Sequence, residues 1–170
     1  MSLPSQHHLS RQAGFTLLEI LVVLILLGII VSVAMLSIGG SRKEQLEHSM
    51  QRLQQVIRMA HEEAVLNQYE LALKFKPHAY EFQTLKKDKW QTISQPPFMR
   101  RRELDDVFRI KLLQDGISVS LEKEDSGRIL LFSSGEMTPF ELYMSISGTD
   151  QRMRLQGDAF GKLTLEDASG

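Results

Sequence analysis

The first part of the chain is dominated by one long apolar segment. From Ile20 to Gly40 no side chain is ionisable, and the residues between Phe15 and Ile38 are apolar almost throughout. At about 1.5 Å of rise per helical residue, this segment reaches roughly 35 Å, enough to cross the hydrocarbon core of a bilayer. The pattern therefore predicts a transmembrane helix over residues 15–38.

A narrower apolar stripe follows the glycine pair at positions 39 and 40. Its members are Leu46, Met50, Leu53, Ile57, Ala60 and Ala64. Their steps of four and three residues are the spacing of one helix face, and charged residues fill the other faces. We expect residues 39–66 to form an amphipathic helix that lies half-buried on a globular domain. Each glycine weakens a helix by about 1 kcal/mol relative to alanine, so the joint is a place where the helix can bend.

Beyond Asn67 the hydrophobic period changes to two, which is typical of β-strands. The expected strands are 71–75, 80–83, 89–93, 107–113, 117–121, 128–132, 140–147, 152–155 and 162–165. A hairpin loop is expected at 76–79, and the prolines in 95–97 should end the pairing that precedes them. A long helix followed by short strands predicts an α+β fold in which residues 67–170 form an antiparallel β-sandwich.

Composition limits the number of domains and the kinds of partner. The 170 residues leave room for one small domain after a membrane helix. The formal net charge of −1 gives no general attraction to nucleic acid or anionic lipid. The absence of cysteine excludes disulfides and thiolate metal sites. Arg11, ahead of the apolar segment, marks the cytoplasmic flank and places the bulk of the chain across the membrane.

Motifs of catalysis are missing from the sequence. It contains no phosphate-binding loop, no G-x-S-x-G turn and no dinucleotide-binding fingerprint. On the predicted helix, His48 has only Glu44 one turn away, and His61 lies thirteen residues further on. We therefore predict no enzymatic activity, no cofactor and no metal site.

One carboxylate interrupts the apolar segment. Glu19 lies four residues after Phe15. An ionised side chain in hydrocarbon costs about 2 to 3 kcal/mol unless it is paired or close to the interface. The charge alone leaves two explanations open: Glu19 reaches the headgroups by itself, or a cation from another helix neutralises it.

The residues Gly14-Phe15-Thr16-Leu17-Leu18-Glu19, followed by a long apolar helix, resemble the amino-terminal signal of type IV pilins and type II secretion pseudopilins. An ordinary secretory signal places its cleavage site after the apolar core, whereas here the small residue precedes it. The resemblance implies a cytoplasmic leader at residues 1–14, cleavage by prepilin peptidase between Gly14 and Phe15, and N-methylation of Phe15. It also implies a pilin-like fold in which residues 39–66 continue the membrane helix as one long helix. In the filament that it implies, Glu19 pairs with the freed amine of a neighbouring subunit.

A second segment resembles the H-type minor pseudopilins. Its sequence is Phe132-Ser133-Ser134-Gly135-Glu136-Met137-Thr138-Pro139-Phe140, and it departs from the wider group at Ser134, where aspartate is more usual. Gly135 is expected to supply a positive φ, and Pro139 to set the start of the next strand. Phe132 and Phe140 are expected to anchor the two ends of this motif loop, residues 132–140, in the core.

Together the two resemblances imply a minor pseudopilin of the type II secretion system. Such a protein is a single-pass protein of the inner membrane with its C-terminal domain in the periplasm. It assembles into a pseudopilus that helps to export folded proteins across the outer membrane. The implied partners are other major and minor pseudopilins, prepilin peptidase, the inner-membrane assembly platform with its cytoplasmic ATPase, and secreted cargo or the outer-membrane secretin.

The alternative is a minor pilin of a type IV pilus that binds DNA for uptake, since such proteins share the leader and the helix. The candidate DNA contacts would be the arginines at 100–102, or Arg152 and Arg154 on one face of a strand. Acidic residues at 103, 105 and 106 directly follow the first cluster and would screen its field. A salt-bridged loop is therefore favoured over contact with nucleic acid.

The leader boundary can be tested by substitution of Gly14→Ala. If prepilin peptidase cuts after Gly14, as the resemblance implies, we expect the variant to keep its full-length amino terminus. Intact-mass spectrometry of the membrane-extracted protein measures this directly. Normal maturation of the variant by cleavage at another position would place the boundary elsewhere.

Overall fold

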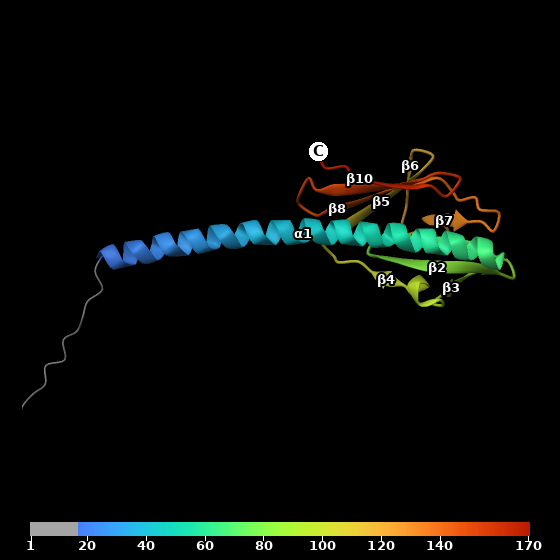
Figure 1. The fold of residues 1–170 in the computed structure, drawn as a ribbon, viewed down its shortest axis with the longest axis horizontal. Helices are drawn as coiled ribbons and strands as arrows, with labels where there is room; N and C mark the ends of the chain where they lie inside the picture. Colours follow the sequence, from blue (N-terminus) through green and yellow to red (C-terminus); the bar gives the residue numbers. More distant parts are fainter. Residues whose placement is uncertain (1–16) are drawn as a thin grey trace, which may run out of the picture. The chain divides into compact units, whose positions relative to one another are not determined.

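The computed structural model describes residues 17–170, with side chains placed for 17–30 and 42–170. The chain divides into two units after Gly40. Helix α1 (Leu17–Asn67) begins in the first unit and ends in the second (Figure 1). It is assigned as helix through positions 39 and 40, where the sequence allows a bend.

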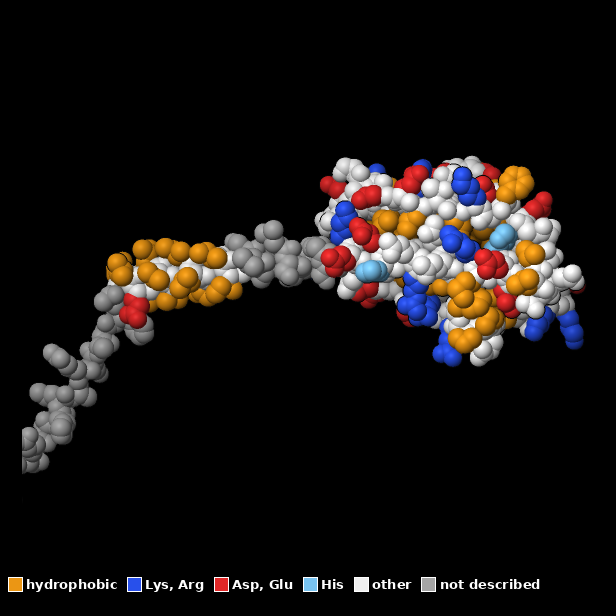
Figure 2. Space-filling model, viewed as in Figure 1, with side chains coloured by type: hydrophobic (Ala, Val, Ile, Leu, Met, Phe, Trp, Pro, Cys, Tyr) orange, Lys and Arg blue, Asp and Glu red, His pale blue; other side chains and the backbone are white. Residues whose placement is uncertain are grey.

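Apart from Glu19, the described side chains of the first unit are hydrophobic on all faces of the helix. Large apolar residues between Leu17 and Ile30 have exposed fractions from 46% to 87%. Figure 2 shows hydrophobic side chains covering the visible side of this segment. The predicted membrane segment, residues 15–38, lies partly outside the described side chains. Within the part of the chain that the structure describes, no helix combines the length and hydropathy needed to cross a membrane.

In the second unit, the apolar stripe of α1 is buried as the sequence predicts. All six stripe residues, from Leu46 to Ala64, have exposed fractions of 1% or less. The strands that follow form two antiparallel sheets, and in Figure 1 strands β2, β3 and β4 lie on one side of α1 and strands β5, β8 and β10 on the other. The α+β prediction of a long helix followed by antiparallel sheets is confirmed.

The first sheet has the order β3-β2-β1-β7, with β4 pairing to the same edge of β2 as β3. Its strands are β1 (Leu71–Lys76), β2 (Ala79–Lys86), β3 (Lys89–Ile93), β4 (Arg102–Glu103) and β7 (Arg128–Leu131). The predicted hairpin joins β1 and β2, and a short 3-10 helix, η1 (Pro97–Met99), follows the end of β3. The sequence missed β4, because a strand of two residues is too short to show a period.

The second sheet has the order β10-β9-β8-β5-β6. Its strands are β5 (Phe108–Gln114), β6 (Ile117–Val119), β8 (Phe140–Ile146), β9 (Arg152–Gly157) and β10 (Leu163–Asp167). On β8 every second residue is buried, from Phe140 to Ile146. This alternation places one face of the sheet on the core and the other outward.

One core joins the helix and both sheets. It includes Leu53 and Ile57 of α1, Leu73 and Phe82 of the first sheet, and Leu142 of the second sheet, all with exposed fractions of 0%. Since these side chains belong to a single cluster, loss of volume on α1 should destabilise the whole domain.

We expect Leu53→Ala to lower the free energy of unfolding by about 2 to 5 kcal/mol, because it leaves a cavity at the centre of the core. The matched control is Leu66→Ala on the same helix, where the leucine is 79% exposed; its effect should stay within about 0.5 kcal/mol. Urea unfolding of the full chain in detergent, followed by circular dichroism, measures both. Equal losses for the two variants would contradict the packing described here.

Candidate assembly site

Each of the two units contains one candidate region for assembly. In the first unit it is the amino-terminal end of α1, and in the second it is the place where loops are bonded to the carboxyl-terminal half of α1. Gly14 and Phe15, the predicted cleavage and methylation positions, lie outside the described residues. Glu19 lies in the first turn of α1 and its side chain is exposed. A carboxylate is favourable there, because the amino-terminal end of a helix carries partial positive charge.

The motif loop connects β7 to β8 and turns at Gly135. Gly135 has a φ of +88°, a conformation that costs glycine little and other residues more. Its amide donates to the carbonyl oxygen of Phe132 at 3.0 Å, and the Phe132 amide donates to Glu136 at 2.9 Å. The predicted positive φ is confirmed, and Pro139 directly precedes the first residue of β8.

The two phenylalanines of the motif loop differ in burial. Phe140 is 3% exposed and belongs to the core, as expected. Phe132 is only half-buried and lies outside the core cluster, so the expectation that it anchors the loop was wrong. The reason is strand alternation: Ile129 and Leu131 of β7 face the core, so the next residue faces away.

His61 of α1 holds the motif loop against the helix. Its Nε2 lies 2.8 Å from the carbonyl oxygen of Gly135. Because a carbonyl oxygen only accepts, the ring donates through a protonated Nε2. A second bond supports the same loop, since the Ser133 hydroxyl donates to Glu70 Oε1 at 2.9 Å.

A turn between β9 and β10, residues 158–162, packs against the same histidine. Asp158 Oδ1 accepts from the amides of Phe160 and Lys162, at 2.9 Å each. Gly161 has a φ of +81°, and a Cβ built on it would lie 2.4 Å from the ring of His61. The two loops are also bonded to each other, because the Met137 amide donates to the carbonyl oxygen of Ala159 at 3.0 Å.

Further contacts fasten β10 along α1. Gln54 Nε2 donates to the carbonyl oxygen of Leu163 at 3.3 Å, and Lys43 Nζ lies 3.3 Å from Asp167 Oδ2. Hydrogen bonds from Ser169, with a further one from Lys43, lower the pKa of Asp167 from 3.8 to about 2. Together with the His61 contacts, these bonds fix the domain to the helix over residues 43–61.

The basic residues considered for DNA contact are partly engaged with carboxylates. Arg101 Nε lies 2.7 Å from Glu103, and Arg154 lies 2.6 Å from Glu166 and 3.6 Å from Glu141. The expected salt-bridged loop is thus present at Arg101. Within residues 17–170 no three His, Asp or Glu side chains converge in the manner of a metal site.

Comparison of the chain with models of known protein families shows the family to which it belongs. The model described as "Type II transport protein GspH" matches residues 49–161, which include the motif loop and most of both sheets. The chain belongs to this family. A second model, the prokaryotic N-terminal methylation motif, matches residues 9–35, the range that contains Gly14, Phe15 and Glu19. The cleavage and methylation of this GspH-family chain remain predictions.

Curated relatives and solved structures agree with that assignment. Type II secretion system protein H of Aeromonas hydrophila is 32% identical, over 91% of this chain and 93% of its own length. The Pseudomonas aeruginosa protein of the same name is 31% identical, over 86% and 91%. The crystal structure of the minor pseudopilin EpsH of Vibrio cholerae has the same fold, with a TM-score of 0.63 at 23% identity, covering 75% of this chain and 99% of that chain.

Sequence reasoning missed the contacts of His61 with the two loops. The available indication was its place four residues after Ile57, at the border of the buried stripe. A polar residue at that border is well placed to bond a loop that crosses the helix. The other half of the contact, Gly161, could not be found from spacing, because it lies a hundred residues further along the chain.

The close approach of Gly161 to His61 can be measured with a pair of alanine substitutions. Gly116→Ala is the control, because Gly116 has a φ of +75° but open space around it; it should cost about 1 to 2 kcal/mol in backbone strain. Gly161→Ala adds a clash with the ring and should cost about 1 to 3 kcal/mol more. In the double variant His61→Ala/Gly161→Ala this excess should disappear, and additive effects would show that the two residues do not press on each other.

Proposed function

We propose that this GspH-family chain works as a minor pseudopilin that is anchored in the inner membrane by the first half of α1. Its globular domain then lies in the periplasm, and the chain enters a pseudopilus that helps to export folded proteins. One observation carries the proposal: a helix segment that is apolar on all its described faces bears a single carboxylate in its first turn. A helix of that kind requires lipid or other helices around it.

Maturation of the amino terminus is the second part of the proposal. Prepilin peptidase would cut between Gly14 and Phe15, and methylation would follow on the freed Phe15 nitrogen. The new terminus is a cation at the end of an apolar helix, and Glu19 of a neighbouring subunit is a matching anion. Pairing the two charges offsets the cost of each in a low-dielectric environment and sets the axial register between subunits.

The domain contributes rigidity to such a filament. Because the loops at 132–140 and 158–162, together with β10, are bonded to α1, the globular domain must follow any movement of the carboxyl-terminal half of the helix. This suits a structural subunit, in which a movement of the helix has to be passed on to the domain. We infer a non-enzymatic role, with the other pseudopilins as direct partners. The assembly platform and its ATPase, together with cargo or the secretin, complete the proposed set of partners.

The alternative of a DNA-binding minor pilin has less support. Two of its candidate contacts, Arg101 and Arg154, are paired with carboxylates at 2.7 Å and 2.6 Å. The curated relatives described above carry the name type II secretion system protein H.

The role of Glu19 is tested by Glu19→Ala in cells that carry the other pseudopilins. We expect the variant to insert into the membrane normally but to be absent from sheared pseudopili, because its partner amine is left without a counter-ion. Carbonate extraction measures insertion, and immunoblots of sheared filaments measure assembly. The control is Glu44→Ala, an exposed acid of α1 in the second unit, which should assemble normally. Undiminished assembly of Glu19→Ala would overturn the ion-pair proposal.

A further inference from the structure

The outer face of the first sheet contains two charged side chains that are almost completely buried. On β1, Leu73 and Phe75 belong to the core, so Lys74 between them lies on the other face. Lys74 lies opposite Glu81 of β2 and opposite Arg128 of β7. The exposed fractions of Lys74 and Glu81 are 4% and 5%. Lysine and glutamate are seldom buried to this degree unless another group compensates their charge.

Glu81 is compensated by its neighbours. Lys76 Nζ lies 3.1 Å from Glu81 Oε2, and Gln83 Nε2 donates to Glu81 Oε1 at 3.2 Å. The Thr92 hydroxyl donates to the same Oε1 at 3.4 Å, and Arg101 Nη1 lies 3.8 Å from Oε2. Both carboxylate oxygens of Glu81 therefore have donors beside them.

Lys74 is compensated only in part. Its ammonium group donates to the carbonyl oxygen of Glu124, in the segment between β6 and β7. Within the described part of the chain, this is the one hydrogen bond of Lys74 Nζ, and no carboxylate forms an ion pair with it. An ammonium group has three N–H donors, so two of them have no acceptor among the described residues.

The pKa of Lys74 reflects this shortage of negative charge. Burial of the ammonium group lowers the pKa most, and the charge of Arg128 lowers it further. The carboxylates of Glu124 and Glu81 act in the opposite direction without restoring the ordinary value. A bound anion close to Nζ would stabilise the charged form of Lys74.

Lys74 borders an open cavity of about 850 Å³ on this face of the sheet. Two further cations in the wall of the cavity are Lys76 and Arg101. Trp90 and Leu121 add apolar surface. The volume is within the range of cavities that hold small organic ligands. The cavity therefore places a buried cation with unused N–H groups near an aromatic ring and an aliphatic side chain.

Acidic side chains in the same wall do not supply the missing charge. Glu81 already pairs with Lys76. Glu122 and Glu124 are exposed to water, which weakens the field of their charges, and neither carboxylate forms an ion pair with Lys74. A further anion can therefore come only from outside the residues that the structure describes.

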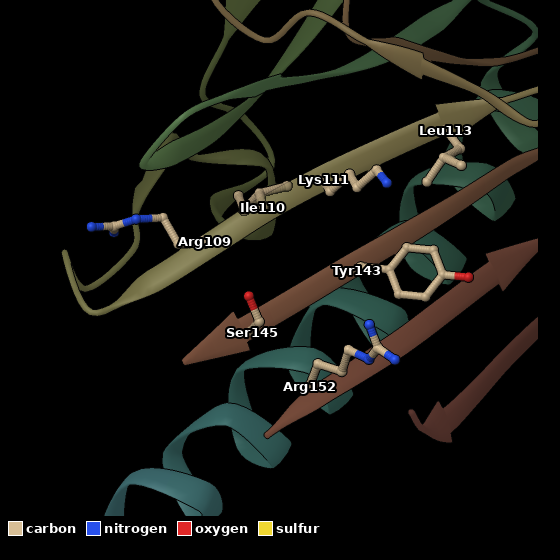
Figure 3. Close-up of a pocket in the computed structure, with 7 residues that line it drawn as sticks. All are labelled: Arg109, Ile110, Lys111, Leu113, Tyr143, Ser145 and Arg152. Carbon is tan, nitrogen blue, oxygen red and sulfur yellow. The ribbon is translucent and has the colours of Figure 1, made fainter. Parts of the chain in front are cut away.

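A cavity on the outer face of the second sheet lacks such a buried charge. It measures about 370 Å³, and its cations are Arg109, Lys111 and Arg152. All three are exposed, and Figure 3 shows Arg109 extending away from the other two. Water satisfies exposed cations, so the cavity beside Lys74 is the stronger candidate for a ligand site.

We propose that the cavity beside Lys74 binds an organic acid that combines one carboxylate with an apolar group. The carboxylate accepts hydrogen bonds from the two unused N–H groups of Lys74, and the positive charges of Lys76 and Arg101 add to the attraction. The apolar group lies against Trp90 and Leu121. A single carboxylate matches the single cation that the domain leaves without a counter-ion.

Two sources offer this chemistry: a free organic acid, and the carboxyl terminus of a peptide that ends in an apolar residue. Both place a carboxylate next to an aliphatic side chain. The site is independent of the proposed role in secretion, because it rests only on the first sheet and its charges.

The fluorescence of Trp90 can measure binding, because it is the one tryptophan of the chain and borders the cavity. With the full chain in detergent, 3-methylbutanoate should change the emission in a saturable way. The uncharged amide of the same acid should bind more weakly by about tenfold or more, because it cannot form charge-assisted hydrogen bonds. The dipeptide N-acetyl-alanyl-leucine and its amide test the second source in the same way.

Three variants locate the binding site. Lys74→Met removes the charge but keeps a side chain of similar length, so it should weaken binding of the acid by about tenfold or more. Lys111→Met is the matched control, because Lys111 is exposed on the second sheet; the affinity should change less than about twofold. Leu121→Ser reduces the apolar wall and should weaken binding by about threefold or more.

Selective binding of 3-methylbutanoate over its amide assigns a free acid, and selective binding of the dipeptide alone assigns a chain terminus. Equal affinity for acid and amide, or an equal loss in Lys74→Met and Lys111→Met, would overturn the site. A saturable response to neither acid would do the same. Circular dichroism checks the fold of each variant; should Lys74→Met not fold, undiminished binding to Leu121→Ser is the contradicting result.

Discussion

Burial of one face of α1 holds the domain together, because in the described sheets no strand of one sheet pairs with a strand of the other. The stripe from Leu46 to Ala64 lies in the same core as residues from both sheets. Apolar burial has no preferred direction, so the stripe alone would allow the helix to slide along the sheets. Directional bonds at Lys43, Gln54 and His61 remove that freedom.

A single helix therefore meets two different physical demands. Apart from Glu19, its described residues from 17 to 30 are apolar on every side, as suits lipid or other helices. Beyond position 41 the helix is apolar on one side only, as suits packing on a folded domain. A subunit built in this way can gain contacts along its first half without rearranging its core. This is the physical basis for proposing a filament subunit whose domain moves as one body with the carboxyl-terminal half of α1.

The charged side chains on the outer faces of the two sheets differ in how deeply they are buried. On the first sheet, Lys74 and Glu81 are buried, and burial together with the charge of Arg128 lowers the pKa of Lys74. The segment between β6 and β7 is bonded to β1, since Lys74 donates to the carbonyl oxygen of Glu124, and the Phe75 amide donates to the carbonyl oxygen of Gly127 at 2.9 Å. Polar groups on that face are thus used within the domain. On the second sheet, Arg109, Lys111 and Arg152 remain exposed.

The sequence determined the elements whose pattern is long or repeated: the helix stripe, most strand positions, the hairpin at 76–79 and the turn at Gly135. These follow from local periodicity and backbone preference, which act over a few residues. Tertiary structure decided the rest. It assigned the strands to two sheets, formed β4, turned Phe132 away from the core and brought Gly161 against His61, because each of these depends on residues that meet only after the chain has folded back on itself.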